Sequence, residues 1–395
     1  MSGGRNQGGR SRNRQSRGGS GTAAAAPRLA PQLLSELNAL FYSRDPGGEF
    51  FARLEHLSLL ACADEILAPT YAAPRTVGST FISGEVRPTA DDRARLLRSE
   101  SLVACHHAAE TLLRFYFAHA DPQCLSPWRA MAGEINYSEF KRKVARLLAD
   151  WSDDMRGPVA ETFLGGTSPS NAGISLPAAE FEDAVDAYAL VLQFCAERLL
   201  NEAFAYNAAK HGFANIDADM AKMSMNDTPL YEGPMITYLS KKNAVDAARG
   251  RENPKEWFLN LAPALADLDL ATAYMAARGI SAIWNVGRRR FTGQSGSVPV
   301  MSSQDVKASM FAPVRGADAH LKRFVSELPK LNDDGTFAPT HHNIEPFTIP
   351  ADFTAESGPL AIKHVDLVVR RQDRRPLVDT SRYLLPISPR GSQSV

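Results

Sequence analysis

Apolar residues recur at helical spacing through most of the first 210 residues, and this periodicity constrains the fold more than any other feature of the chain. Leu33 and Leu37 begin the first apolar stripe. Further stripes run over residues 50–67, 137–151 and 181–210, and stretches rich in Pro and Gly separate them. The pattern predicts a series of amphipathic helices, each with one buried face.

The longest uninterrupted helix is expected over residues 89–120. Thr89 can cap its first turn, where Asp91 and Asp92 interact favourably with the positive end of the helix dipole. Asp121 and Pro122 end the pattern.

The C-terminal half mixes helical and extended signals. We expect a helical block over residues 255–292, split near Pro263, and a shorter helix near residues 315–328. Short extended runs occur at residues 234–239, 343–349 and 360–369.

These patterns predict a mainly α protein, built as a bundle of long antiparallel helices with a smaller α+β C-terminal part and a disordered N-terminal arm. The predicted boundaries are residues 1–26 for the arm, 27–215 for the helical domain and 216–395 for the mixed α+β region.

The N-terminal arm is basic, although the whole chain has 44 basic and 44 acidic residues. It carries five arginines and no acid, and residues 360–395 carry a charge of +4, which leaves −9 on residues 27–359. A flexible Gly/Ser-rich arm with spaced arginines can follow a phosphate backbone. We therefore predict that the arm binds nucleic acid, RNA rather than DNA; a solubilising tail is the alternative. The candidate binding residues are Arg5, Arg10, Arg12, Arg14 and Arg17.

Several functional classes lack their sequence signals. No apolar stretch reaches about 18 residues and no secretory signal is visible, so neither a membrane span nor export is expected. Four widely spaced cysteines indicate reduced thiols and a cytoplasmic protein. The motifs for phosphate loops, dinucleotide binding, serine hydrolases and zinc proteases are missing, and His106, His107 and Glu110 lack a fourth ligand. We therefore expect no cofactor and no metal.

Arg114 and His119 are the first candidates for catalysis. An imidazole can transfer a proton near neutral pH, and a guanidinium can hold a phosphate and stabilise its developing charge. The pair therefore suits phosphodiester cleavage. Glu110 lies one turn before Arg114, where the two side chains can pair, and on a straight helix Arg114 and His119 lie about 140° apart.

A second candidate cluster lies at the end of the helix predicted to reach Lys210. Asn207 and His211 share a helical face, which makes them candidates for supporting the same chemistry. Cations in a last turn followed by Gly212 are also an ordinary helix C-terminus.

These features resemble the HEPN superfamily of all-helical domains over residues 90–215 at most: long antiparallel helices, an Arg-x4-His element and a terminal Asn-x-x-Lys-His-Gly. The resemblance implies a homodimer or higher homo-oligomer and a metal-independent RNase of a bacterial defence or toxin type. Arg114 and His119 would then be the motif pair, with His211 or Asn207 in support.

Three functions follow as hypotheses. The first is an RNA-associated protein that acts as a metal-independent endoribonuclease, with Arg114 as phosphate clamp and His119 as general acid–base. The second is a non-catalytic nucleic-acid-binding, packaging or assembly protein that uses its Arg-rich arm. The third is a helical scaffold with no nucleic-acid role.

Overall fold

The computed structural model describes most of the chain after the N-terminal arm. The described residues are 29–133, 136–210, 215–225, 228–246, 251–315, 321–347, 349, 353, 360–373, 378–379 and 381–387. Of the residues that the structure describes, 54% are helical and 19% lie in strands, so the prediction of a mainly α protein is confirmed.

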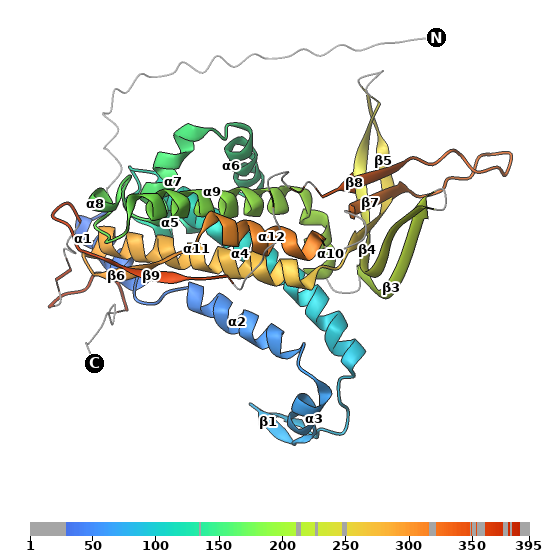
Figure 1. Ribbon diagram of the computed structural model, residues 1–395, viewed down its shortest axis with the longest axis horizontal. Coiled ribbons are helices and arrows are strands. Elements are labelled where there is room, and N and C mark those ends of the chain that lie inside the picture. The colour runs from blue at the N-terminus through green and yellow to red at the C-terminus, as the bar shows by residue number, and fades with distance from the viewer. Residues whose placement is uncertain are drawn as a thin grey trace, which may run out of the picture.

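The helices form a body elongated along its longest helices, with a β-sheet at one end (Figure 1). Among the described residues, no helix is both long enough and apolar enough to cross a membrane. The helices are α1 (Pro31–Phe41), α2 (Gly47–Leu59), α3 (Asp64–Ala72), α4 (Ala90–Ala120), α5 (Pro127–Gly133), α6 (Tyr137–Ala149), η1 (Asp153–Met155), α7 (Arg156–Phe163), α8 (Pro169–Ala172), α9 (Ala178–Asn201), α10 (Ala203–Lys210), α11 (Ala266–Thr292) and α12 (Ser303–Arg315).

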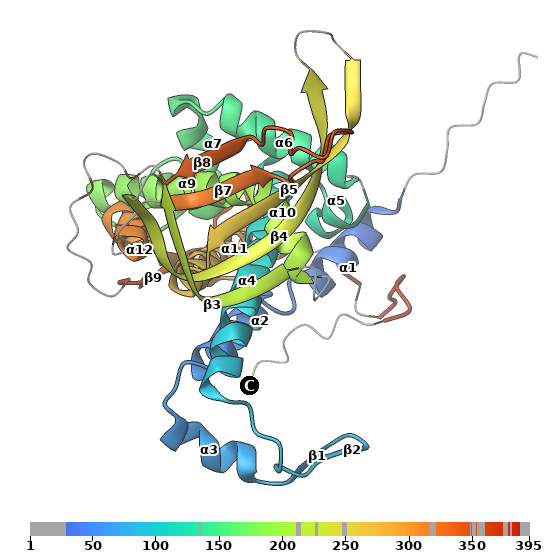
Figure 2. The ribbon, with the colours of Figure 1, turned by 90° about the vertical axis from the view of Figure 1, so that its right-hand side faces the viewer.

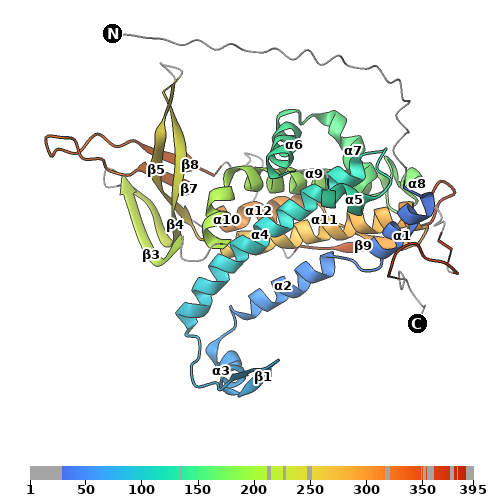
Figure 3. The same ribbon diagram turned by 180° about the vertical axis from the view of Figure 1, so that it is seen from behind.

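Helices α4 and α11 pack side by side and form the centre of the body (Figures 1 and 3). Helix α4 begins with the predicted cap: the Thr89 hydroxyl accepts a hydrogen bond from the Asp92 amide, and the Asp92 carboxylate accepts one from the Thr89 amide. Helix α11 approaches closely because it carries small residues; a Cβ added to Gly279 would lie 2.9 Å from Leu112 of α4.

One apolar core runs through the body, and it crosses the predicted boundary at residue 215. It joins Tyr42 of the N-terminal part to α11 and to Leu367 of a small antiparallel pair of strands. The pair consists of β6 (Gly296–Val300) and β9 (Lys363–Leu367). The C-terminal half therefore contributes a central helix to the helical body, because α11 buries apolar side chains on most of its circumference.

The larger sheet is fully antiparallel, in the order β3-β4-β5-β7-β8. Figure 2 shows it in front of the helices. One face packs on the body, where Ile236 and Tyr238 contact Leu102 of α4 and Ala205 of α10. The strands are β3 (Asn215–Met225), β4 (Thr228–Asp246), β5 (Arg251–Pro263), β7 (Leu321–Glu327) and β8 (His342–Pro346).

Some predicted elements are corrected by the sheet. Residues 255–263 form part of β5 and not a helix, and residues 321–327 form β7 where a helix was expected. A short apolar run in a sequence is compatible with either a helix or a strand. Residues 255–263 form a strand because β5 pairs with both β4 and β7. The long helix predicted over 181–210 is two helices, α9 and α10, which meet at Glu202.

The predicted extended runs are confirmed. Residues 234–239 lie within β4, β8 covers most of 343–349, and β9 lies within 360–369. The chain also forms β3, which carried no strand signal.

Residues 61–89 leave the body between α2 and α4, and we call them the projecting segment. They contain α3 and the hairpin β1 (Arg75–Val77) and β2 (Thr80–Ile82), and they stand apart from the body in all three views (Figures 1–3). Gly84, which approaches the Ala72 carbonyl, is the one buried residue among them. The segment therefore has no core of its own.

Candidate functional site

Arg114 is held on the surface of α4 by its own helix and by α6. Its Nε donates to Glu110 Oε1 at 2.8 Å, and its guanidinium lies 4.2 Å from the centroid of the Phe140 ring. About a quarter of the side chain remains exposed. The ion pair and the aromatic contact account for its position without a ligand.

His119 lies inside the body and is fully hydrogen-bonded. Nδ1 is 2.7 Å from the Phe115 carbonyl oxygen, which can only accept, so Nδ1 carries the proton. Nε2 then accepts from the Tyr42 hydroxyl at 2.7 Å. Burial lowers the pKa of His119 to about 4, since desolvation disfavours the charged ring. The ring is therefore neutral at pH 7, and both nitrogens are already bonded.

The two predicted catalytic side chains do not meet. Helix α4 continues to Ala120, so the 140° separation expected for Arg114 and His119 is kept. Arg114 contacts Phe140 of α6, whereas His119 contacts Tyr42 and lies against Gly287 of α11. No described contact joins them, and within the described part of the chain they line different pockets.

The remaining predicted site residues do not complete that pair. Asn207 is exposed on α10, and no described hydrogen bond joins it to Arg114 or His119. His211 lies outside the described residues. The same is true of the five arm arginines: Arg5, Arg10, Arg12, Arg14 and Arg17.

A cleft of about 460 Å³ lies where α4, α7 and α11 end. Two arginines line it, but both bind backbone carbonyls at its wall. Arg370 donates to Gly165 and Asn171 at 2.6 and 2.7 Å, and Arg290 donates to His119 at 3.4 Å. These arginines fix loops, which is a structural role.

Arg289 extends this structural set and is fully buried. Its guanidinium donates to the carbonyls of Ala172 and Gly165, at 2.5 and 3.1 Å. The arginines at the end of α11 thus bind the carbonyls of neighbouring loops. Because Arg289 is fully buried, it adds no cationic surface.

The projecting segment is a candidate site that the helical periodicity of the sequence does not indicate. Its large apolar side chains are exposed: 65% for Ile66, 63% for Val77, 67% for Phe81 and 91% for Val86. A short helix and a two-stranded hairpin are marginal in water without packing. Apolar side chains gathered on such a projection are typical of a contact with another molecule.

The base of the projecting segment is firmly tied to the body. Arg93 of α4 is buried and pairs with Asp64 of α3. The guanidinium also donates to the Pro88 carbonyl at 3.4 Å. The two ends of the segment are therefore fixed at the start of α4, and its tip extends away from them.

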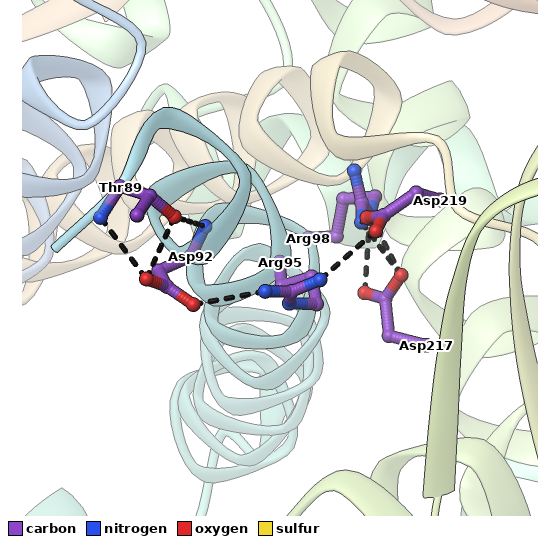
Figure 4. Close-up of polar contacts among 6 residues, drawn as sticks. All are labelled: Thr89, Asp92, Arg95, Arg98, Asp217 and Asp219. Atoms are coloured by element: carbon purple, nitrogen blue, oxygen red, sulfur yellow. Dashed lines mark hydrogen bonds and ion pairs between the residues drawn. The ribbon is translucent and has the colours of Figure 1, made fainter.

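The start of α4 also holds the sheet (Figure 4). Arg98 donates to both oxygens of Asp217 on β3, at 2.7 to 3.0 Å, and to Asp219 at 2.5 Å. Arg95 connects Asp219 to Asp92, with N···O distances of 2.9 and 2.8 Å. Segment, helix and sheet are thus joined through one turn and a half of α4.

Comparison with known proteins adds no relative: no family model, no curated protein and no solved structure matches this chain.

Proposed function

We propose that this is a non-catalytic nucleic-acid-binding protein that assembles with copies of itself. Its Arg-rich arm binds the phosphate backbone, and its projecting segment packs on a neighbouring copy. The function corresponds to packaging or assembly on a nucleic acid, with RNA the favoured partner.

The observation that carries the proposal is the projecting segment. Four large apolar side chains are exposed on this segment, which has no core of its own. Burying each of them fully in an interface would stabilise a complex by about 1.5–3 kcal/mol. A second copy is the natural partner, because every molecule carries the same segment and the partner is always present at equal concentration.

The charge distribution supports the nucleic-acid part. The arm carries +5 and residues 27–359 carry −9, so the long-range attraction of a polyanion comes from the arm. Binding through the arm leaves the body free to contact other bodies.

The nuclease hypothesis gains no support from the site geometry. Arg114 is paired with Glu110, and His119 is buried, neutral and bonded at both nitrogens. A general acid–base must reach the proton that it transfers, which this ring does not.

Salt-dependent RNA binding tests the proposal directly. The purified full chain is compared with a variant in which all five arm arginines are replaced by glutamine. Five released counterions predict a slope of log K against log salt that is about 3.5 less steep in the variant on single-stranded RNA. Equal affinity and slope in the two proteins would contradict the role of the arm, and absence of binding by either would favour the scaffold hypothesis.

The same preparation tests the nuclease. The wild type and His119→Ala are incubated with labelled RNA in chelator. We expect intact RNA with both; cleavage by the wild type that the variant loses would restore the nuclease hypothesis.

A further inference from the structure

The five-stranded sheet has a second face that turns away from the helices (Figure 2). Strand alternation assigns its members, because Tyr238 and Asn260 point to the helical body and their neighbours point away. We call this surface the outer sheet face. Its described members include Ile216, Leu239, Lys241, Trp257, Leu259, Phe324, Ser326 and His342.

The outer sheet face divides into a closed and an open part. At one end β3 departs from regular register between Ala218 and Ala221, and a small apolar cluster forms around Met235, which is fully buried. At the other end Leu239 is 50% exposed and Trp257 is 47% exposed. The open part therefore presents apolar and aromatic surface to solvent.

A cation and aromatic rings lie together on this part of the face. Lys241 lies directly across from Trp257 in the β4–β5 register, and its Nζ is 5.1 Å from the centroid of the indole ring. At the border with the closed part, the His342 ring stacks on Phe324, with centroids 5.6 Å apart, and Phe324 is partly buried against the Met235 cluster. His342 is exposed, and its Nδ1 lies 3.0 Å from the Ser326 hydroxyl.

The charge of this face has one sign. Among the described side chains on it, Lys241 is a cation and no carboxylate is present. Acidic residues of the same strands, such as Asp217 and Glu345, point to the other face, where they pair with Arg98 and Arg323. Exposed rings beside a cation, with acids kept away, match a ligand with flat apolar rings and negative charge.

We propose that the outer sheet face is a stacking platform for the bases of a single-stranded nucleic acid. This rests on the proposed function, in which the arm already brings nucleic acid to the protein. A base stacks on Trp257, and a second contacts the ring pair of His342 and Phe324. Lys241 lies on the other side of Trp257 from that ring pair, where it meets the phosphate that flanks the first base.

The dimensions fit a short stretch of single strand. Neighbouring strands are about 4.8 Å apart, so the path from Lys241 on β4 to His342 on β8 spans about 15 Å. Sheet platforms of this width stack about two or three bases. A duplex keeps its bases stacked inside and cannot offer their faces, so the platform selects single strands.

The test uses the full chain with its five arm arginines replaced by glutamine, so that platform binding is measured without the arm. The probe is a fluorescently labelled 12-nucleotide oligouridine, followed by anisotropy, with a duplex of equal length beside it. In this background, Trp257→Ala should bind the single strand at least about tenfold more weakly, whereas Trp257→Phe should retain most of the affinity because it keeps a stacking ring. Lys241→Gln should make the salt slope shallower by about 0.7.

A matched control separates stacking from general damage. Trp128 on α5 is 38% exposed and lies on the helical body, so Trp128→Ala should leave the affinity unchanged. Unfolding midpoints of all variants show whether the sheet is intact, and Lys241→Gln keeps the test decisive if Trp257→Ala fails to fold.

Each outcome decides the inference. Loss of single-strand affinity in Trp257→Ala, with Trp128→Ala unaffected, supports the platform. Unchanged affinity in Trp257→Ala overturns it and leaves the arm hypothesis standing. Absence of binding by the protein with its native arm overturns both. If Trp257→Ala changes the molecular mass of the protein in solution but not its affinity for RNA, the face binds a second copy of the chain. That result would also overturn the platform.

Discussion

At the scale of single residues, Tyr42, His119 and Gly287 pack closely where the end of α1 meets α4 and α11. A Cβ added to Gly287 would lie 2.4 Å from the Tyr42 hydroxyl and 2.8 Å from His119 Nε2. A side chain at position 287 would displace the hydrogen-bonded Tyr42 and His119, so the site requires glycine. His119 therefore has a structural role in this contact.

Gly287→Ala should destabilise the protein by about 1–3 kcal/mol, because overpacking displaces a bonded pair. Gly157 in α7 is the control: nothing lies within 4 Å of a Cβ added there, so Gly157→Ala should be neutral or stabilising by up to about 1 kcal/mol. Urea unfolding measures both, and equal stability of the two variants would refute the packing role.

The buried histidines also predict a pH dependence. Burial lowers the pKa of His119 to about 4 and that of His106 to about 3, below the ordinary value of 6.5. Between the lowered pKa and 6.5, the unfolded chain binds protons that the folded chain does not. The free energy of unfolding is therefore highest above pH 6.5 and falls as the pH is lowered below it.

His119→Gln isolates this effect. The loss between pH 6.5 and 5 should be smaller in the variant by about 1.4 kcal/mol per pH unit, because one buried titrating ring is removed. Unfolding free energies at several pH values measure the difference. Parallel pH curves for variant and wild type would show that His119 is not desolvated.

At the scale of elements, the sheet depends on α4 for its position. Arg98 and Asp217 are both 11% exposed, whereas Arg95 is 42% exposed in the same network (Figure 4). The inner pair should therefore hold β3, and the outer arginine should contribute little.

Arg98→Ala should cost about 1.5–3 kcal/mol and leave Asp217 without its bidentate partner. Hydrogen exchange should quicken in β3 and β4 while α9 stays protected, since the apolar core of the helices does not include the sheet. Arg95→Ala is the control and should change neither. Protection of β3 unchanged in Arg98→Ala would contradict this anchoring.

The projecting segment gives the second prediction at this scale. Phe81→Ser combined with Val86→Ser should weaken self-association at least about tenfold, because two exposed apolar side chains lose their partner surface. The paired control is Leu331→Ser with Phe337→Ser; both positions are exposed on a different loop, at 67% and 73%. Sedimentation equilibrium measures the effect, and equal association of the two double variants would remove the segment from the interface.

Local signals predicted the helices better than the sheet. The Thr89 cap and the Asp121 stop lie next to the helix that they bound, so α4 was readable from the chain. Strand β5 depends on β7, which lies some sixty residues further along, and no local pattern records that pairing.

The candidate site was less predictable for a related reason. The ion pair of Arg114 with Glu110 follows from helical spacing alone. The burial of His119 depends on Tyr42, which is 77 residues away in the chain. A lone basic pair in a sequence carries no information on which face it will occupy.

At the scale of the whole molecule, the proposed function separates two tasks. The arm is cationic, residues 27–359 have a net charge of −9, and the projecting segment offers apolar surface at a distance from α1 (Figure 1). Nucleic acid would concentrate several copies through their arms, and the projecting segments would then connect neighbouring bodies.

Sedimentation velocity of the full chain mixed with a labelled single-stranded RNA of about 100 nucleotides tests this account most directly. We predict that the RNA remains full length and sediments with several 43.0 kDa chains, in a complex that the Phe81→Ser and Val86→Ser double variant makes smaller. RNA that sediments free, or that is recovered as fragments, would contradict it.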